Sequence, residues 1–308
     1  MAKFNYGGQA VIEGVMMRGR SHMAVAVRAP DGHIVTHEEP LTSRIYRSRW
    51  MKLPFLRGLV MLWDALVLGM RTLLWSADVA MAEDEVEFTG PIAWTTVAGS
   101  LALGVGIFFL LPSALAQWLE RFWPSPVVSS IIEGFVRLVM FLAYVWLIGL
   151  MPDIQRVFAY HGAEHKTINA FEAGASLTPS EVARFPTAHT RCGTSFLLFV
   201  LVLAILFHIP LQFEAWYLRL LSRILIIPVV AGVAYEWIRY AADHLHLRWV
   251  RWLIRPGLLL QRLTTREPDM DMLEVAIAAL RPVLIADGVW RAEDDAASVR
   301  APEPAAVA

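Results

Sequence analysis

The sequence predicts a mainly α-helical membrane protein with about four transmembrane helices, an interfacial helix and a small N-terminal β-sheet. Three observations lead to this fold class. Hydrophobic residues make up 56% of the 308 residues. Charged residues make up 18%, whereas a soluble domain carries about a quarter. The apolar residues are gathered in long blocks, with a mean hydropathy of +0.49 over the chain, so the lipid bilayer is the first expected partner.

Residues 1–45 are expected to form a β-rich segment on the cytoplasmic side. An apolar run at residues 10–18 is bounded by glycines, and residues 23–28 alternate small apolar side chains. A Pro-Asp-Gly turn at residues 30–32 precedes a return strand, and together these features predict a small antiparallel sheet. Glu13 is an acid inside the first strand. The first residues hold no apolar signal-peptide core, so internal helices are expected to direct the chain to the membrane.

Residues 46–90 are interpreted as a basic interfacial helix followed by an acidic linker. Arg57, Asp64 and Arg71 recur at intervals of seven and therefore share one face of an otherwise apolar helix. A single charged stripe suits the membrane surface better than the hydrocarbon centre, so this helix is expected to be interfacial or re-entrant. The acidic residues 83–87 follow as a solvated linker.

Residues 91–151 and 194–241 each contain two predicted transmembrane helices. These helices are expected over residues 92–115, 131–151, 194–209 and 220–240. Three glycines in the first of them favour a close helix contact, namely Gly99, Gly104 and Gly106. Acid–arginine pairs near one end of the second and fourth helices are expected to reach the membrane interface, namely Glu133 with Arg137 and Glu236 with Arg239.

The distribution of positive charge predicts how the chain is oriented. Arginine and lysine are concentrated in the N-terminal segment, in the loop at residues 152–193 and after the last predicted helix. By the positive-inside rule, both termini and this loop lie on the cytoplasmic side of the bacterial inner membrane, which the chain crosses several times. Residues 242–291 are expected to form cytoplasmic C-terminal helices. Residues 292–308, rich in Ala, Pro, Glu and Asp, are predicted to be a disordered tail.

The loop at residues 152–193 carries the motif His-x-x-Glu-His, formed by His161, Glu164 and His165. A helix is predicted over residues 153–172, and on it the two histidines leave the same face because they are four residues apart. Two histidines and a carboxylate, with water in the fourth position, form a ligand set of catalytic zinc. We therefore predict a divalent metal ion, for example zinc, held by the two histidines, with Glu164 as general base or acid.

The third metal ligand has three candidates that the sequence does not separate: Glu172, His189 and Cys192. Glu172 falls on the same helical stripe as the histidines. Cys192 is the single cysteine of the chain, which excludes an intramolecular disulfide and leaves a ligand or a small buried residue. If the N-terminal sheet folds over this helix, Glu13 becomes a further ligand or base and Arg18 a clamp for an anion.

Four blocks of the sequence carry a resemblance to a known family. They are residues 7–19 (GGQAVIEGVMMRG), 160–169 (YHGAEHKTIN), 191–196 (RCGTSF) and 263–268 (LTTREP). These blocks resemble the signatures of an uncharacterised bacterial membrane-protein family represented by YqhQ. The resemblance covers about residues 7–284 and implies a predicted metal-dependent membrane enzyme without an established substrate. Similarity to the inverzincin proteases is confined to the five-residue motif.

Two functional hypotheses follow from the sequence. The first is a cytoplasm-facing metal-dependent enzyme, a hydrolase acting on a lipid, a peptide or another membrane-proximal substrate. The alternative is a non-catalytic scaffold, assembly or transport-accessory factor whose polar blocks form a structural network. Either protein can form homo-oligomers. No basic run interleaved with aromatic residues is present, which sets nucleic-acid partners aside.

Overall fold

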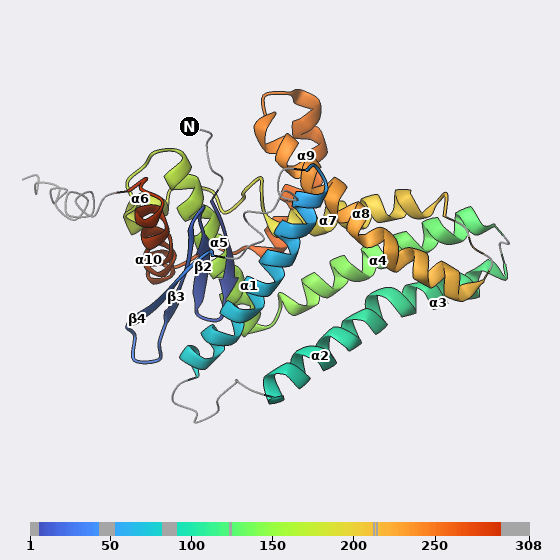
Figure 1. Cartoon of the computed structure of the whole chain (residues 1–308), viewed down its shortest axis with the longest axis horizontal. Coiled ribbons are helices and arrows are strands. Elements are labelled where there is room, and N and C mark those ends of the chain that lie inside the picture. The colour runs from blue at the N-terminus through green and yellow to red at the C-terminus, as the bar shows by residue number, and fades with distance from the viewer. Residues whose placement is uncertain are drawn as a thin grey trace, which may run out of the picture.

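A computed structural model describes residues 6–42, 53–81, 91–122, 125–211, 213 and 215–290. The sheet domain contains β1 (Gly7–Val11), β2 (Gly14–Arg18), β3 (His22–Arg28), β4 (Ile34–Pro40), α5 (Pro152–Glu172), α6 (Pro179–Val182) and α10 (Met270–Ala286). The apolar bundle contains α2 (Pro91–Val105), η3 (Gly106–Leu110), α3 (Leu111–Glu120), α4 (Pro126–Ile148), α7 (Gly193–His208) and α8 (Trp216–Asp243). Two further helices, α1 (Leu56–Ala80) and α9 (Arg248–Thr264), pack against the bundle (Figure 1). The predicted acidic linker and disordered tail lie outside the described residues.

The four strands form one antiparallel sheet in the order β1-β2-β3-β4, as predicted. The return strand after the Pro-Asp-Gly turn is confirmed, because β3 pairs with β4 and Gly32 supplies a positive φ of 91°. Residues 10–18, predicted as one strand, are instead two strands. The chain reverses at residues 12–13, where Glu13 takes a left-handed conformation with φ 50°. Glu13 therefore stands in a turn and not within a strand.

Both faces of the sheet are covered by helices, which explains why its central strands are apolar on both sides. Alternate residues face α5 and α10 on one side (Val15, Met17, Ala24, Ala26) and α1 on the other (Met16, Val25, Val27). Each of these residues is at most 4% exposed. The register is fixed by this burial, because a slip of one residue would exchange the two faces.

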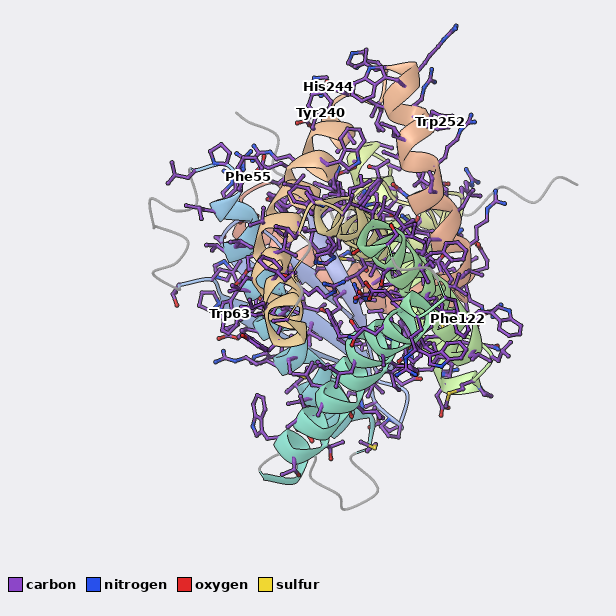
Figure 2. All side chains as sticks on the ribbon, turned by 90° about the vertical axis from the view of Figure 1, so that its right-hand side faces the viewer. Phe55, Trp63, Phe122, Tyr240, His244 and Trp252 are labelled. Atoms are coloured by element: carbon purple, nitrogen blue, oxygen red, sulfur yellow. The ribbon has the colours of Figure 1, made fainter. Side chains whose placement is uncertain are left out.

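Helix α1 has one face against the sheet and an ion pair to the bundle. Two of the charges predicted as a stripe at the membrane surface, Arg57 and Asp64, have partners instead. Asp64 accepts a hydrogen bond of 3.1 Å from Arg18 of β2, and Arg57 pairs with Glu236 of α8. The outer side of the helix carries Trp63, which is 64% exposed (Figure 2). Helix α1 thus joins the sheet domain to α8.

Four helical stretches are long and apolar enough to cross a membrane: residues 56–80, 94–120, 127–148 and 221–243. The last three contain most of the predicted first, second and fourth spans. The predicted third span forms α7, which has 16 residues. At 1.5 Å per residue it covers about 24 Å, less than the ~30 Å of a hydrocarbon core. Helix α1 replaces it in the set of four.

The glycines of the first span do not make the close helix contact that was expected of them. At Gly99, Gly104 and Gly106, an added Cβ would meet no atom of the described residues within 4 Å. The physical reason is that this stretch of the span lies on the outside of the bundle, with neighbours such as Leu101 and Leu103 more than 60% exposed. The three glycines therefore do not bring this helix close to another described helix.

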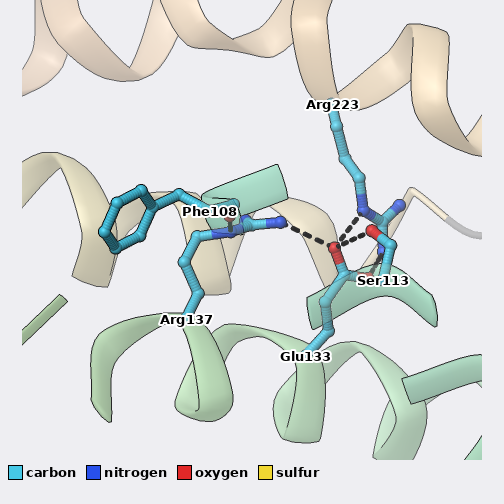
Figure 3. A network of polar contacts seen from close by, with 5 residues as sticks. All are labelled: Phe108, Ser113, Glu133, Arg137 and Arg223. Carbon is cyan, nitrogen blue, oxygen red and sulfur yellow. Dashed lines mark hydrogen bonds and ion pairs between the residues drawn. The ribbon is translucent and has the colours of Figure 1, made fainter. Parts of the chain in front are cut away.

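A polar network lies inside the bundle, where Glu133 and Arg137 were expected to reach the interface. Both are at most 5% exposed. Glu133 accepts hydrogen bonds from Ser113 of α3 and Arg137 at 2.8 Å each, and from Arg223 of α8 at 2.7 Å (Figure 3). Arg137 also donates to the carbonyl of Phe108 at 2.9 Å, which lies in the π-helical turn η3. Partners from three helices keep these charges inside, and they tie α3, α4 and α8 together.

A close approach of two segments shapes the centre of the sheet domain. A side chain at position Gly162 of α5 would collide with the carbonyl oxygen of Arg266. The Arg266 N–H also donates to the carbonyl of Phe158, at 2.9 Å. The chain that leaves α9 therefore runs directly across α5. This contact brings the end of α9 to the helix that carries His161 and His165.

Candidate metal centre

Two histidines of α5 present the same ring nitrogen to a common point. His161 and His165 are four residues apart, and their ring centroids lie 4.3 Å apart. The Nδ1–H of His161 donates to the carbonyl of Thr264 at 2.8 Å, and that of His165 donates to the carbonyl of Thr187 at 2.6 Å. These hydrogen bonds fix the tautomer and the ring orientation, as is usual for metal-binding histidines. The Nε2 atoms are left as acceptors.

Cys192 completes the cluster from a different element. It is the N-cap residue of α7 and is 4% exposed. Its Sγ lies 3.3 Å from His161 Nε2 and 3.0 Å from Thr194 Oγ1. Ligand atoms of His161, His165 and Cys192 all lie within 4.8 Å of one another. The thiol and the two imidazoles therefore converge, although Cys192 lies 27 positions after the nearer of these two histidines.

The spacing of these three atoms suits a tetrahedral metal ion. With Zn–N of about 2.0 Å and Zn–S of about 2.3 Å, neighbouring ligand atoms of a zinc site lie about 3.5 Å apart. The 3.3 Å between Cys192 Sγ and His161 Nε2 is close to that value. The cluster could thus hold a metal ion through three protein ligands, with the fourth position left for another group.

Glu164, predicted as the base or acid, lies beside the cluster but not in it. It is 5% exposed and accepts a hydrogen bond from the N–H of Gly8 in β1. Burial raises the pKa of its carboxyl to about 7, against the opposing effects of His161 and the Gly8 N–H. Its oxygens are not among the three converging ligand atoms. Glu164 is therefore a buried carboxyl next to the cluster.

Glu172 and His189, the other candidates for the third ligand, form a separate pair. Glu172 binds Arg191, and its Oε2 lies 3.7 Å from His189 Nε2. The main chain of His189 is held on both sides by the side-chain amide of Gln261 in α9, at 2.8 Å each. Glu172 is thus engaged by a guanidinium, and its oxygens are not among the atoms that converge with His161 and His165. Of the three candidates, the structure brings Cys192 to the two histidines.

The stability of the protein is expected to fall between about pH 4.5 and pH 2 because of Glu172. Burial raises the pKa of this carboxyl, but His189 and Arg191 outweigh burial and hold the pKa at about 2, below its ordinary 4.5. The ionised form is favoured in the folded state, so this stability is present above pH 4.5 and lost as pH falls towards 2. The difference corresponds to roughly 3 kcal/mol at most. The apparent thermal midpoint of wild type should drop between pH 5 and pH 3.

The matched variant for this measurement is Glu172→Gln, which cannot gain a proton in this range. Its midpoint should be lower than that of wild type at pH 5 and should change much less between pH 5 and pH 3. An equal acid-dependent drop in both proteins contradicts the assignment of this pH dependence to Glu172.

Glu13 and Arg18, expected to join the histidines, have other partners. Glu13 accepts two hydrogen bonds from Arg156, at 2.6 and 2.5 Å. Arg18 pairs with Asp64 of α1 at 2.9 Å. The sheet does pack on α5, but Glu13 lies in the turn at its end and Arg18 is drawn to the α1 side. The sheet instead reaches the motif through the N–H of Gly8, which donates to Glu164. The side chains of Glu13 and Arg18 are held by Arg156 and Asp64.

Several groups that position the cluster carry no signal in the sequence. The carbonyls of Thr187 and Thr264 and the N–H of Gly8 are main-chain atoms, present in almost every residue. Gln261 is 1% exposed, but as a polar residue in a helix with four arginines it looks like part of a solvated face. The block at residues 263–268 was the one indication that the end of α9 belongs to the site.

Comparison with known proteins places the chain among proteins without an assigned function. A family described as "Protein of unknown function (DUF1385)" matches residues 53–286. The chain is 32% identical over 292 residues to "Uncharacterized protein YqhQ" of Bacillus subtilis (strain 168). The aligned region covers 91% of this chain and 92% of that protein. No solved structure matches.

Proposed function

The chain belongs to the DUF1385 family of proteins of unknown function, and we propose that it is a membrane-bound, metal-dependent hydrolase of a membrane-proximal substrate. The observation that carries this proposal is the convergence of His161 Nε2, His165 Nε2 and Cys192 Sγ. The distribution of arginine and lysine supports a site on the cytoplasmic side of a bacterial inner membrane. The four long apolar helices support the membrane location.

The donor set fits zinc. The two imidazoles are held in the tautomer that leaves Nε2 as an acceptor, and a thiolate is a ligand that zinc favours. Three protein ligands and an open fourth position are typical of catalytic zinc, whereas structural sites supply four. When bound, the ion would polarise a substrate oxygen and acidify a water molecule.

We assign proton transfer to Glu164. Its carboxyl is buried next to the cluster, and the Gly8 N–H fixes its orientation. In this role a carboxylate oxygen of Glu164 receives a proton from the attacking water and returns it to the leaving group. Glu13 and Arg18 are left out of this assignment because Arg156 and Asp64 hold them.

One observation favours a second candidate function, a metal clamp without catalysis. The histidines belong to the sheet domain and Cys192 to the start of α7 in the apolar bundle. An ion bound by all three would therefore hold the two parts of the protein together. In this case the chain is a scaffold, and Glu164 only fills the space between α5 and β1.

Metal analysis and a hydrolysis assay on the same preparations test the proposal. Full-length protein in a neutral detergent should retain about one zinc ion per chain, and His165→Ala should retain none. Glu164→Gln should retain zinc but lose about 100-fold in turnover of chromogenic ester, amide and phosphodiester substrates. His246→Ala, which removes a histidine outside the cluster, is the control and should keep both properties.

The outcomes separate the candidates. Folded wild-type protein that retains no zinc contradicts both functions. Stoichiometric zinc without hydrolysis of any substrate class contradicts the enzyme and supports the clamp. Hydrolysis that survives in Glu164→Gln shows that another group transfers the proton.

A further inference from the structure

A cavity of about 610 Å³ lies between α9 and the segment at residues 185–188. Part of its wall is apolar, formed by residues such as Phe185 and Leu258. Three cationic side chains form another part: Lys166, Arg255 and Arg262. Glu267 is the one acidic residue that lines it. Three cations against one carboxylate make the cavity electropositive.

Two of these cations have no counter-ion in the part of the chain that the structure describes. Lys166 is 3% exposed, and its Nζ contacts the carbonyl of Ala183 at 2.8 Å and Glu267 at 2.5 Å. The guanidinium groups of Arg255 and Arg262 make no hydrogen bond or ion pair with any described residue. They are seven residues apart on α9 and therefore project from the same face, about 10 Å apart along the axis.

The position of α9 relates this cavity to a membrane surface. Helices α3, α4, α7 and α8 extend to the right in Figure 1, whereas α9 stands upright at their near end. If the bundle crosses a bilayer, α9 therefore lies along its surface. Trp252 projects from its outer side (Figure 2) and is 67% exposed, and Leu259 is 55% exposed. Exposed Trp and Leu beside a row of arginines are typical of a helix lying at the headgroup level.

We propose that this cavity binds the phosphodiester headgroup of an anionic phospholipid. Arg255 and Arg262 would bind the phosphate oxygens, to which guanidinium groups are geometrically suited. The acyl chains would lie along the exposed apolar residues of α9. Lys166 and Glu267 would form the floor, where their ion pair is already buried on the lysine side.

This binding site does not depend on the metal. The cavity lies next to the cluster, because Lys166, which lines it, follows His165 in α5. Thr187 also lines the cavity, and its carbonyl holds the His165 ring. Neither Arg255 nor Arg262 touches the three converging ligand atoms. Loss of zinc and loss of lipid binding are therefore separate results.

Lipid binding by the full-length protein in a neutral detergent tests the proposal. Native mass spectrometry would measure the dissociation constant of short-chain phosphatidylglycerol, with phosphatidylcholine of the same chains as the neutral lipid. The double variant Arg255→Gln/Arg262→Gln should bind phosphatidylglycerol at least about tenfold more weakly than wild type. The control Arg248→Gln/Arg251→Gln removes the same charge from α9 outside the cavity lining and should change the constant less than about twofold.

Three results overturn the proposal. The first is unchanged affinity in Arg255→Gln/Arg262→Gln. The second is an equal loss in the control variant, which would mean that surface charge alone attracts the lipid. The third is displacement of phosphatidylglycerol by equimolar glycerol 3-phosphate, which would make the ligand a soluble phosphate. Zinc content, measured on each variant, should equal that of wild type.

Discussion

Replacement of Glu133 by alanine is expected to destabilise the protein by about 3–5 kcal/mol. The Glu133 carboxylate accepts hydrogen bonds from three side chains on three different helices, and all of its charged partners are at most 5% exposed. Without it, Arg137 and Arg223 remain buried and lose their shared carboxylate. Removing one member of a buried ionic group costs more than the group itself contributes, because the remaining charge stays desolvated.

This effect is measured as the apparent unfolding midpoint in detergent, which should fall by about 10 °C. Glu236→Ala is the matched control, because it removes a carboxylate from an arginine pair whose side chains are 21–22% exposed. Such a pair contributes about 1 kcal/mol or less. The triple change Glu133→Leu/Arg137→Met/Arg223→Met should recover most of the loss, as apolar replacement of buried ions often does. Equal midpoints for Glu133→Ala and Glu236→Ala contradict a stabilising role of the network.

If the cluster binds zinc as proposed, removal of the ion is expected to have a comparable effect. A ligand that binds only the folded state stabilises it by about 4 kcal/mol at a thousand times its dissociation constant. A chelator should therefore lower the apparent unfolding midpoint of the zinc-loaded wild type. The effect should be large because the ligands lie far apart in sequence and come from the sheet domain and the bundle.

Cys192→Ser is the variant that isolates this contribution. Serine keeps the size of the side chain but is a much poorer zinc ligand than a thiolate, so the chelator should shift its midpoint by less than half the wild-type shift. His246→Ala should show the full wild-type shift. A chelator effect of equal size in Cys192→Ser and wild type contradicts metal binding at this cluster.

The elements of the fold could be predicted because each is a local pattern. Apolar blocks predicted the helices of the bundle, and alternation with a Pro-Asp-Gly turn predicted the sheet. The motif placed His161 and His165 on one face because helical spacing alone decides that. The choice of Cys192 over Glu172 depends on where Arg191 lies in the folded protein, which spacing does not contain.

The prediction for the charges of the spans was wrong for a related reason. Glu133 stands about two turns inside α4, and hydropathy gives the same value whether such a residue reaches the interface or is buried. Its partner Arg223 lies 90 residues further along the chain. Similarly, Glu13 looked like part of a strand because the run around it is apolar, although the turn at that position needs only one residue in a left-handed conformation.

The groups of the candidate metal centre come from parts of the chain that the ribosome makes at widely separated times. The ribosome delivers Gly8 first, the two histidines and Cys192 later, and the Thr264 carbonyl that holds His161 only after α8 and α9. The sheet at residues 7–40 is therefore made long before α10, which covers one of its faces. The segment at residues 264–268, which crosses α5, is made after all three converging ligand residues, and α10 follows it. A chain truncated before residue 264 therefore lacks the carbonyl that holds the His161 ring.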